Sequence, residues 1–178
     1  VGRVMAGRGV ALEEAEQYLD PTLRTLLPNP SSFKDMDKAA GRIAAAIEGK
    51  EKIAVFGDYD VDGATSSGLL KRFFNAIGVP VIIYIPDRMK EGYGPNAAAM
   101  DKLKSQGIDL VITADCGIVS FDVLSHAKEI GLEVIVVDHH QAETRLPDAV
   151  AVINPKRHDE SQKFTYLAAV GVTFLLVV

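Results

Sequence analysis

The chain has 178 residues, the size of one ordinary domain, and 48% of them are hydrophobic, which is enough to build a core. Its 19 basic and 24 acidic side chains give a net charge of −5, which argues against a protein coated in positive charge but permits a local basic channel. The single cysteine excludes a disulfide framework within the chain and a cysteine-rich zinc site, and it makes the cytoplasm the expected location.

Neither end of the chain has the pattern of a targeting or membrane segment. The first ten residues lack the apolar core of a signal peptide, and the longest apolar runs are strand-sized, far below the ~20 residues of a spanning helix. Residues 174–178 are all apolar, as in a helix that continues without a cap. We therefore expect no membrane partner, and we expect the chain to be a fragment of a longer protein.

The first fifty residues are predicted to be helical. Residues 12–19 form a short amphipathic segment that Pro21 stops. A second helix is expected from about residue 35 to 48, because apolar residues recur there at helical spacing and Gly49 supplies a C-terminal stop. We interpret residues 1–50 as a helical N-terminal extension.

From residue 52 the pattern changes to strands that alternate with helices. Strands are expected at 52–56, 79–85, 109–113, 132–137 and 149–153. Helices are expected at 64–77, 95–106, 120–130 and from 167 onward. Strands that are apolar on both faces and alternate with helices indicate a parallel sheet covered on both sides. Residues 51–178 are thus predicted to form one Rossmann-like α/β domain, a parallel β-sheet flanked by helices.

Acidic residues and histidines follow three of the predicted strands. The residues that follow the first, third and fourth predicted strands include Asp58, Asp60, Asp62, Asp115, Asp138, His139 and His140. Ligands of open parallel sheets bind beyond the carboxyl ends of the strands, so these side chains are expected to meet at one edge. Carboxylates packed so closely repel one another, and a divalent cation removes that penalty. Oxygen donors with one or two imidazoles suit Mn²⁺ or Mg²⁺ better than a thiol-binding metal.

Each of these residues also has an ordinary structural interpretation. A single aspartate after a strand is usually a helix cap or a turn residue, and Asp115 fits that role by itself. Two adjacent histidines are commonly a surface feature or a hydrogen-bonded pair. The coincidence at three strand ends favours the metal site over these alternatives.

Two further segments are candidates for binding phosphate or DNA. The helix that follows the first acidic run is expected to open near Thr65 and Ser66, where its amides and hydroxyls face an anion. The loop after the second strand is basic and rich in glycine. Arg88 in that loop suits a phosphate, Tyr93 suits a base or a sugar, and Asn96 ends it. A solvated turn with a helix cap explains the same loop, and the polar loop at 154–158 has only a weak functional signal.

These motifs resemble the DHH phosphoesterase superfamily and, within it, the RecJ branch. Residues 57–66 resemble the first motif, residues 115–117 the second, and Asp138, His139 and His140 the signature that names the superfamily. The basic loop at 88–96, residues 19–21 and the apolar segment around Gly171 also resemble the RecJ branch. The resemblance therefore spans nearly the whole chain.

The resemblance implies a role for each matching residue. Asp60 and Asp62 would each bind one of two divalent cations, Mn²⁺ or Mg²⁺, while Asp115 would bridge them and His139 would be a further ligand. His140 would contact the scissile phosphate. Asp58 and Asp138 would be distant ligands or would orient the others. Arg88 would hold phosphate charge near the site.

The implied activity is that of an exonuclease that degrades single-stranded DNA from the 5′ end, releases 5′-mononucleotides and serves DNA repair and recombination. A single-strand-binding protein and a helicase are the partners that the resemblance implies. RecJ proteins carry one more metal-binding aspartate after the apolar helix, and C-terminal domains that grip DNA. This chain lacks them, so we expect its metal site to be incomplete. Phe56 stands where the pyrophosphatase branch has a histidine ligand, which disfavours that branch.

Three other functions stay open. A DHH phosphodiesterase for short oligonucleotides or cyclic dinucleotides would use the same metal chemistry. A non-catalytic scaffold would keep the fold and lose the metals, which the intact Asp60, Asp62, Asp115 and His139 disfavour. A nucleotide-binding protein without catalysis ranks last, because the glycine-rich dinucleotide motif is absent.

Overall fold

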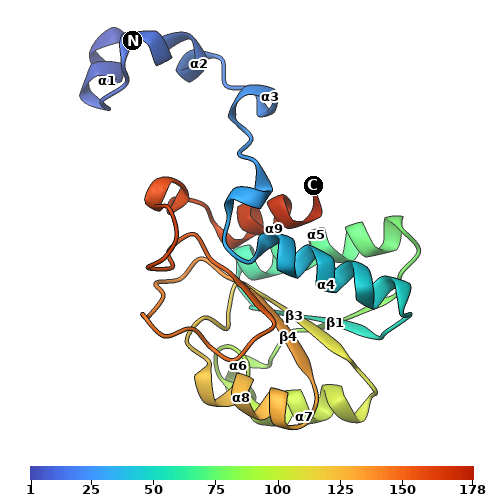
Figure 1. The fold of residues 1–178 in the computed structure, drawn as a ribbon. Helices are drawn as coiled ribbons and strands as arrows, with labels where there is room; N and C mark the ends of the chain where they lie inside the picture. The colour runs from blue at the N-terminus through green and yellow to red at the C-terminus, as the bar shows by residue number, and fades with distance from the viewer.

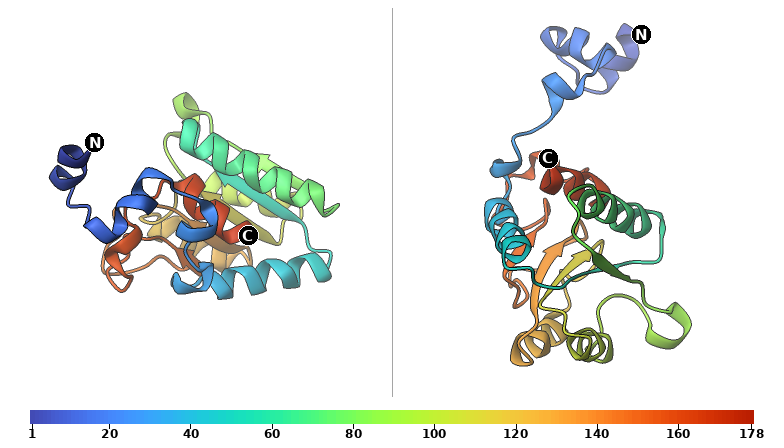
Figure 2. Two further views of the ribbon diagram at one scale, coloured as in Figure 1. Left: turned by 90° about the horizontal axis from the view of Figure 1, so that it is seen from above. Right: turned by 90° about the vertical axis from the view of Figure 1, so that its right-hand side faces the viewer.

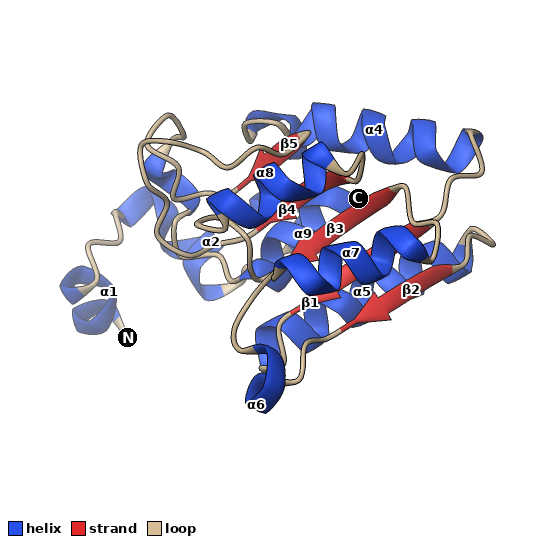
Figure 3. Ribbon diagram, turned by 90° about the horizontal axis from the view of Figure 1, so that it is seen from below, coloured by secondary structure: helices blue, strands red, loops and turns tan.

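A computed structural model describes residues 1–178 (Figure 1). It contains one five-stranded sheet in the order β2-β1-β3-β4-β5, and Figure 3 labels its strands. All four strand pairs are parallel, which confirms the predicted parallel α/β sheet. The strands are β1 Ile53–Gly57, β2 Val81–Tyr84, β3 Leu110–Ala114, β4 Glu133–Val137 and β5 Ala151–Ile153. In this order the chain reverses its direction of progress across the sheet between β1 and β3, and such a switch point is where open α/β sheets bind ligands.

Helices cover both faces of the sheet, as Figure 3 shows. One face packs against α4 Met36–Glu48, α5 Val61–Ala76 and α9 Ala169–Val177. The other face packs against α7 Ala97–Ser105 and α8 Phe121–Glu129. The alternation of side chains along a strand explains the two cores. In β1, Ile53 and Val55 lie in the first cluster while Ala54 and Phe56 lie in the second.

The N-terminal segment divides into an exposed arm and a helix of the core. The arm contains α1 Gly2–Gly7, a 3₁₀ turn at Leu12–Glu14, α2 Ala15–Leu19 and α3 Leu23–Leu26. Its first two helices stand clear of the sheet, as Figure 2 shows, and Met5 is the one buried residue among residues 1–27. Helix α4, by contrast, buries Met36, Ala39 and Ile43 in the core. The predicted extension 1–50 is helical, but its last helix packs as part of the α/β body.

The predicted and observed elements differ most around the polar loops. Helix α5 begins at Val61 rather than at residue 64, because Asp60 caps it. The predicted loop after β2 contains the short helix α6, Arg88–Glu91, and short 3₁₀ turns lie at Pro30–Ser32 and Gln162–Phe164. Helix α9 begins at Ala169, two residues later than expected. None of the helices combines the length and the apolar character needed to cross a membrane.

Candidate metal centre

The polar side chains of the site begin at the carboxyl ends of four neighbouring strands. The last residues of these strands are in register: Gly57 pairs with Ala114, Ala114 with Val137, and Val137 with Ile153. The next residue of each strand is therefore part of one row: Asp58, Asp115, Asp138 and Asn154. Backbone amides continue the ladder through this row, since Asp115 N–H donates to Val137 O at 2.9 Å. The sequence predicted the three acids of the row, but it gave only a weak functional signal to the polar loop at 154–158 that contains Asn154.

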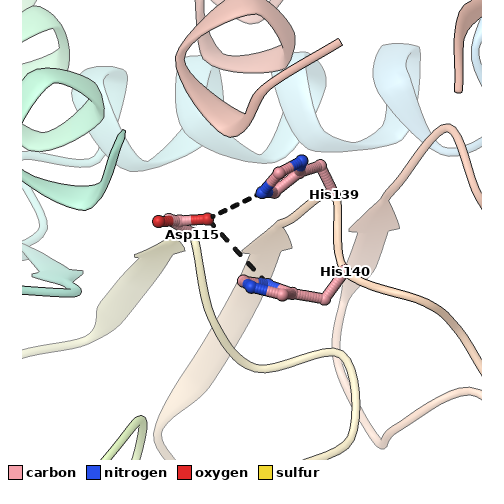
Figure 4. A group of neighbouring side chains, drawn as sticks. All are labelled: Asp115, His139 and His140. Carbon is pink, nitrogen blue, oxygen red and sulfur yellow. Dashed lines mark ion pairs between the residues drawn. The ribbon is translucent and has the colours of Figure 1, made fainter. Parts of the chain in front are cut away.

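Asp115 is the centre of the cluster. Its carboxylate is 1% exposed, and one of its oxygens lies 3.3 Å from His139 Nε2 and 3.9 Å from His140 Nδ1 (Figure 4). Potential ligand atoms of Asp115, His139 and His140 lie within 4.8 Å of one another, and so do those of Asp58, Asp60 and Asp115. Asp115 thus belongs to both groups, as the bridging role expected of it requires.

The surroundings of Asp115 disfavour the ionised form of its carboxylate. Burial, together with the neighbouring Asp62 and Asp60 carboxylates, raises the pKa of Asp115 to about 8. Burial and the Asp60 carboxylate likewise raise the pKa of Asp58. The buried Oδ1 of Asp115 makes no hydrogen bond within the protein. A divalent cation is the partner that would satisfy this oxygen and remove the repulsion.

Asp60 and the glycines beside it shape the first acidic loop. Asp60 caps α5 by accepting a hydrogen bond from Gly63 N–H at 3.0 Å, and this bond lowers the pKa of Asp60. A Cβ atom on Gly63 would lie 2.5 Å from the carbonyl oxygen of Asp58, so only glycine fits there. Asp60 is therefore a helix cap and a member of the acidic cluster at once.

Asp62 is held by a helix from the other end of the chain. Its two carboxylate oxygens accept hydrogen bonds from the Ala169 and Val170 amides, at 2.7 and 2.8 Å, at the start of α9. The Oδ2 atom of Asp62 also lies 3.4 Å from His139 Nε2. The structure thus places Asp62 against His139, and it adds a contact with α9 that no local pattern in the sequence indicates.

Asp138 orients the two histidines. Its Oδ1 accepts hydrogen bonds from the amides of His139 and His140 and pairs with His140 Nδ1 at 2.7 Å, while its Oδ2 accepts one from Ile118 N–H. Burial opposes the charge of Asp138, but these bonds lower its pKa below the ordinary value. The bond to Asp138 raises the pKa of His140. With both oxygens occupied, Asp138 fits the orienting role better than that of a ligand.

The residues predicted for phosphate or DNA fall into two groups. Arg88 lies with its guanidinium 4.5 Å from the centre of the Tyr59 ring, and the Tyr93 hydroxyl is 3.4 Å from the carbonyl oxygen of Asp115. Asn96 caps α7 through Ala99 N–H at 2.9 Å, so its side-chain oxygen is already used. Arg88 and Tyr93 thus border the cluster, whereas Asn96 has the structural role of a cap.

Thr65 and Ser66 do not lie at a helix N-terminus, contrary to the sequence-based expectation. Because α5 begins at Val61, they lie in its second turn. The Thr65 hydroxyl donates to the carbonyls of Val61 and Asp62, and Ser66 is fully buried. Neither side chain presents a donor to a phosphate. The sequence missed Tyr59, although its place between two aspartates could have indicated a partner for Arg88.

Comparisons with known proteins show what this chain is similar to. The model of the DHH family, N-terminal domain, matches residues 52–178. The single-stranded-DNA-specific exonuclease RecJ of Bacillus subtilis is 40% identical over 176 residues, which are 99% of this chain and 22% of that protein.

Two solved structures are similar as well. Exonuclease RecJ bound to manganese is 36% identical with a TM-score of 0.72, over 82% of this chain and 37% of that one. RecJ of Thermus thermophilus in complex with Mn²⁺ is 33% identical with a TM-score of 0.73, over 97% of this chain and 23% of that one. The chain thus spans between 22% and 37% of the length of these relatives.

Proposed function

The chain belongs to the DHH family, and from this premise we propose that it is the catalytic core of a metal-dependent exonuclease of the RecJ type. The proposed substrate is single-stranded DNA, which the enzyme hydrolyses from the 5′ end to release 5′-mononucleotides in DNA repair and recombination. A single-strand-binding protein and a helicase would be its partners, and its DNA substrate would place it in the cytoplasm.

One observation carries the proposal: the residue that two groups of potential metal ligands share has a buried carboxylate oxygen without a hydrogen bond. That residue is Asp115, and burial together with the Asp62 and Asp60 carboxylates raises its pKa to about 8. Oxygen and imidazole donors of this kind suit Mn²⁺ and Mg²⁺. The relatives of known structure that carry manganese support the same ions.

We assign the residues as follows. Asp60, Asp62, Asp115 and His139 would hold two divalent cations, with Asp58 completing the acidic side of the cluster. Such ions activate a water molecule and neutralise charge that develops on a phosphate. His140 would contact the scissile phosphate, and Asp138 would hold its ring through Nδ1. Arg88 and Tyr93 border the cluster and would bind the phosphate and sugar of the strand.

The experiment that tests the proposal uses the protein in the full length that its gene encodes. Oligonucleotides of single-stranded DNA, labelled at the 5′ or the 3′ end, are incubated with Mn²⁺ or Mg²⁺. We expect the 5′ label to appear at once as a mononucleotide and the 3′ label to appear last, and we expect a chelator to stop the reaction. Release of the 3′ label first would contradict the proposed polarity.

The same assay separates the other members of the family. Cleavage of dinucleotides or cyclic dinucleotides, with long strands left intact, would favour a small-substrate phosphodiesterase. No cleavage of any substrate, together with no binding of Mn²⁺, would favour a scaffold. Asp115→Asn is the matched inactive control, because asparagine keeps the size of the side chain and tolerates the positive φ of 65° at this position.

A further inference from the structure

We propose that Asn154 is a positioning residue of the metal centre: its amide holds the carbonyl of His140 and thereby fixes the turn that carries His139 and His140 against Asp115. The inference rests on the proposed function and deepens it. Asn154 belongs to the polar loop at 154–158, to which the sequence gives only a weak functional signal. The structure gives it a defined place, one residue beyond β5 in the row of strand ends.

The side chain of Asn154 is 1% exposed, and the protein occupies both ends of its amide. The Nδ2 group donates to the His140 carbonyl oxygen at 2.9 Å, and Oδ1 accepts from Lys156 N–H at 2.7 Å. A donor thus faces an acceptor and an acceptor faces a donor, which defines the orientation of the amide. A buried polar side chain that is satisfied in this way is rigid, so Asn154 is a fixed point.

The turn that follows β4 is held from two opposite sides. Asp138 accepts hydrogen bonds from the amides of His139 and His140, at 2.7 and 3.1 Å. Asn154 donates to the carbonyl at the end of the same two-residue segment. Asp138 and Asn154, the two residues that hold the turn, follow directly on paired strands. Asp138 N–H donates to Ile153 O at 3.0 Å, and Ile153 is the residue before Asn154. The position of β5 therefore helps to determine where the two imidazoles lie.

The positions of the imidazoles depend on this restraint, because their nitrogens lie close to carboxylate oxygens of the site. His139 Nε2 lies 3.3 Å from Asp115 and 3.4 Å from Asp62. A carbonyl released from Asn154 lets the peptide that follows His140 rotate, which loosens the turn that carries both rings. Groups that orient metal ligands typically change metal affinity by about 10- to 100-fold when they are removed. We expect an effect of that size from Asn154.

The decisive variant is Asn154→Asp. Aspartate keeps the Oδ1 acceptor for Lys156 N–H but turns an acceptor toward the His140 carbonyl, so it removes the contact that the inference requires. Asn154→Ala removes both contacts and serves as a second variant without the added charge. Val152→Ala is the matched control, because Val152 is a buried residue of β5 whose side chain lies in the core cluster beneath α7 and α8.

The first measurement needs no metal. Hydrogen exchange of the His139 and His140 amides is followed by NMR in the metal-free chain. We expect both Asn154 variants to exchange at these amides about tenfold faster than the wild type, while core amides of β1 and β3 keep their protection. Val152→Ala is expected to leave the two histidine amides unchanged relative to the core. Unchanged protection in both Asn154 variants overturns the inference.

The second measurement is the affinity for Mn²⁺, followed by the loss of the EPR signal of free Mn²⁺. We expect about 10- to 100-fold weaker binding by the Asn154 variants and unchanged binding by Val152→Ala. Equal affinity of wild type and Asn154 variants overturns the inference and leaves the proposed function intact. A wild type that binds no Mn²⁺ in its full length removes the metal centre itself, and the inference falls with the proposed function.

Discussion

The polar residues at the carboxyl rim of the sheet differ from those in segment 86–96 in how the chain holds them. Asp58, Asp115 and Asp138 continue buried strands whose ends are in register. Arg88, in contrast, lies on the short helix α6, which stands out from the body (Figure 2). One hydrogen bond, from the Tyr84 hydroxyl to Glu91 at 2.6 Å, ties that helix back to the sheet.

The difference indicates two kinds of task. Metal ligands must keep their mutual distances, and a rim built on paired strands supplies that rigidity. A group that grips a polymer has to admit it and release it, which an exposed segment with few buried contacts can do. Gly92 and Gly94, with φ of 81° and 74°, give the chain the turns that lead from α6 back to Tyr93 and the rim. Changes at the rim should therefore abolish chemistry, whereas changes in segment 86–96 should weaken binding.

The largest effect is expected from Asp115→Asn. Loss of the shared carboxylate should lower kcat by about a thousandfold or more, because metal stabilisation of a transition state amounts to several kcal/mol. The metal-free variant should unfold a few degrees higher than the wild type at pH 8, since a repelled charge disappears from a buried position. Single-turnover cleavage and a thermal melt measure the two effects. Retained activity would contradict the bridging role.

Arg88→Ala should act on binding. The loss of charge-assisted hydrogen bonds to a phosphate should raise KM for single-stranded DNA by about 10- to 100-fold, with the affinity for Mn²⁺ unchanged. Lys90→Ala is the matched control, because Lys90 carries the same charge on the same helix but points to solvent beside Asp87. A change in Mn²⁺ affinity after Arg88→Ala would show that segment 86–96 helps to position the residues of the metal centre.

The metal-free protein should lose stability as the pH rises from about 4 to 8. The folded-state pKa of Asp115 lies near 8, far above the ~3.9 of an unfolded chain, so the folded state binds more protons across this window. The raised pKa of Asp58 acts in the same direction, while the lowered pKa of Asp60 acts only below pH 4. Each kcal/mol lost lowers Tm by about 2–4 °C.

Thermal melts at several pH values, with and without Mn²⁺, test this expectation. Asp115→Asn should flatten the pH dependence of the metal-free protein, and Mn²⁺ should do the same in the wild type by favouring the charged carboxylate. A stability that rises with pH over the same window would show that Asp115 is ionised in the metal-free state.

The smallest effect is expected from Tyr84→Phe, which removes only the bond that holds α6. The variant keeps the stacking of residue 84 on Phe56, whose rings lie 5.3 Å apart. We expect a loss of about 1 kcal/mol in the free energy of unfolding and less than a threefold rise in KM for DNA. Chemical denaturation and steady-state kinetics measure both. A loss of kcat as large as that from Asp115→Asn would end the distinction between the two regions.

The sequence by itself determined the local elements and the acids at their ends. Strands that are apolar on both faces and alternate with helices specify a parallel sheet, and a parallel sheet brings Asp58, Asp115 and Asp138 to one edge. These are properties of short segments and their spacing. The resemblance of residues 57–66, 115–117 and 138–140 to DHH motifs indicated the family, which the match to residues 52–178 shows.

The tertiary structure alone decided which of these groups meet and how each is oriented. The strand order places β1 beside β3, and so puts the Asp58 and Asp60 carboxylates next to Asp115. The amides of α9 hold Asp62 across 107 residues of sequence, and Asn154 holds His140 from a different strand. Because α5 begins at Val61, Thr65 and Ser66 lie in its second turn and not at its N-terminus. Pairings between distant segments depend on packing of the whole chain, which no local periodicity encodes.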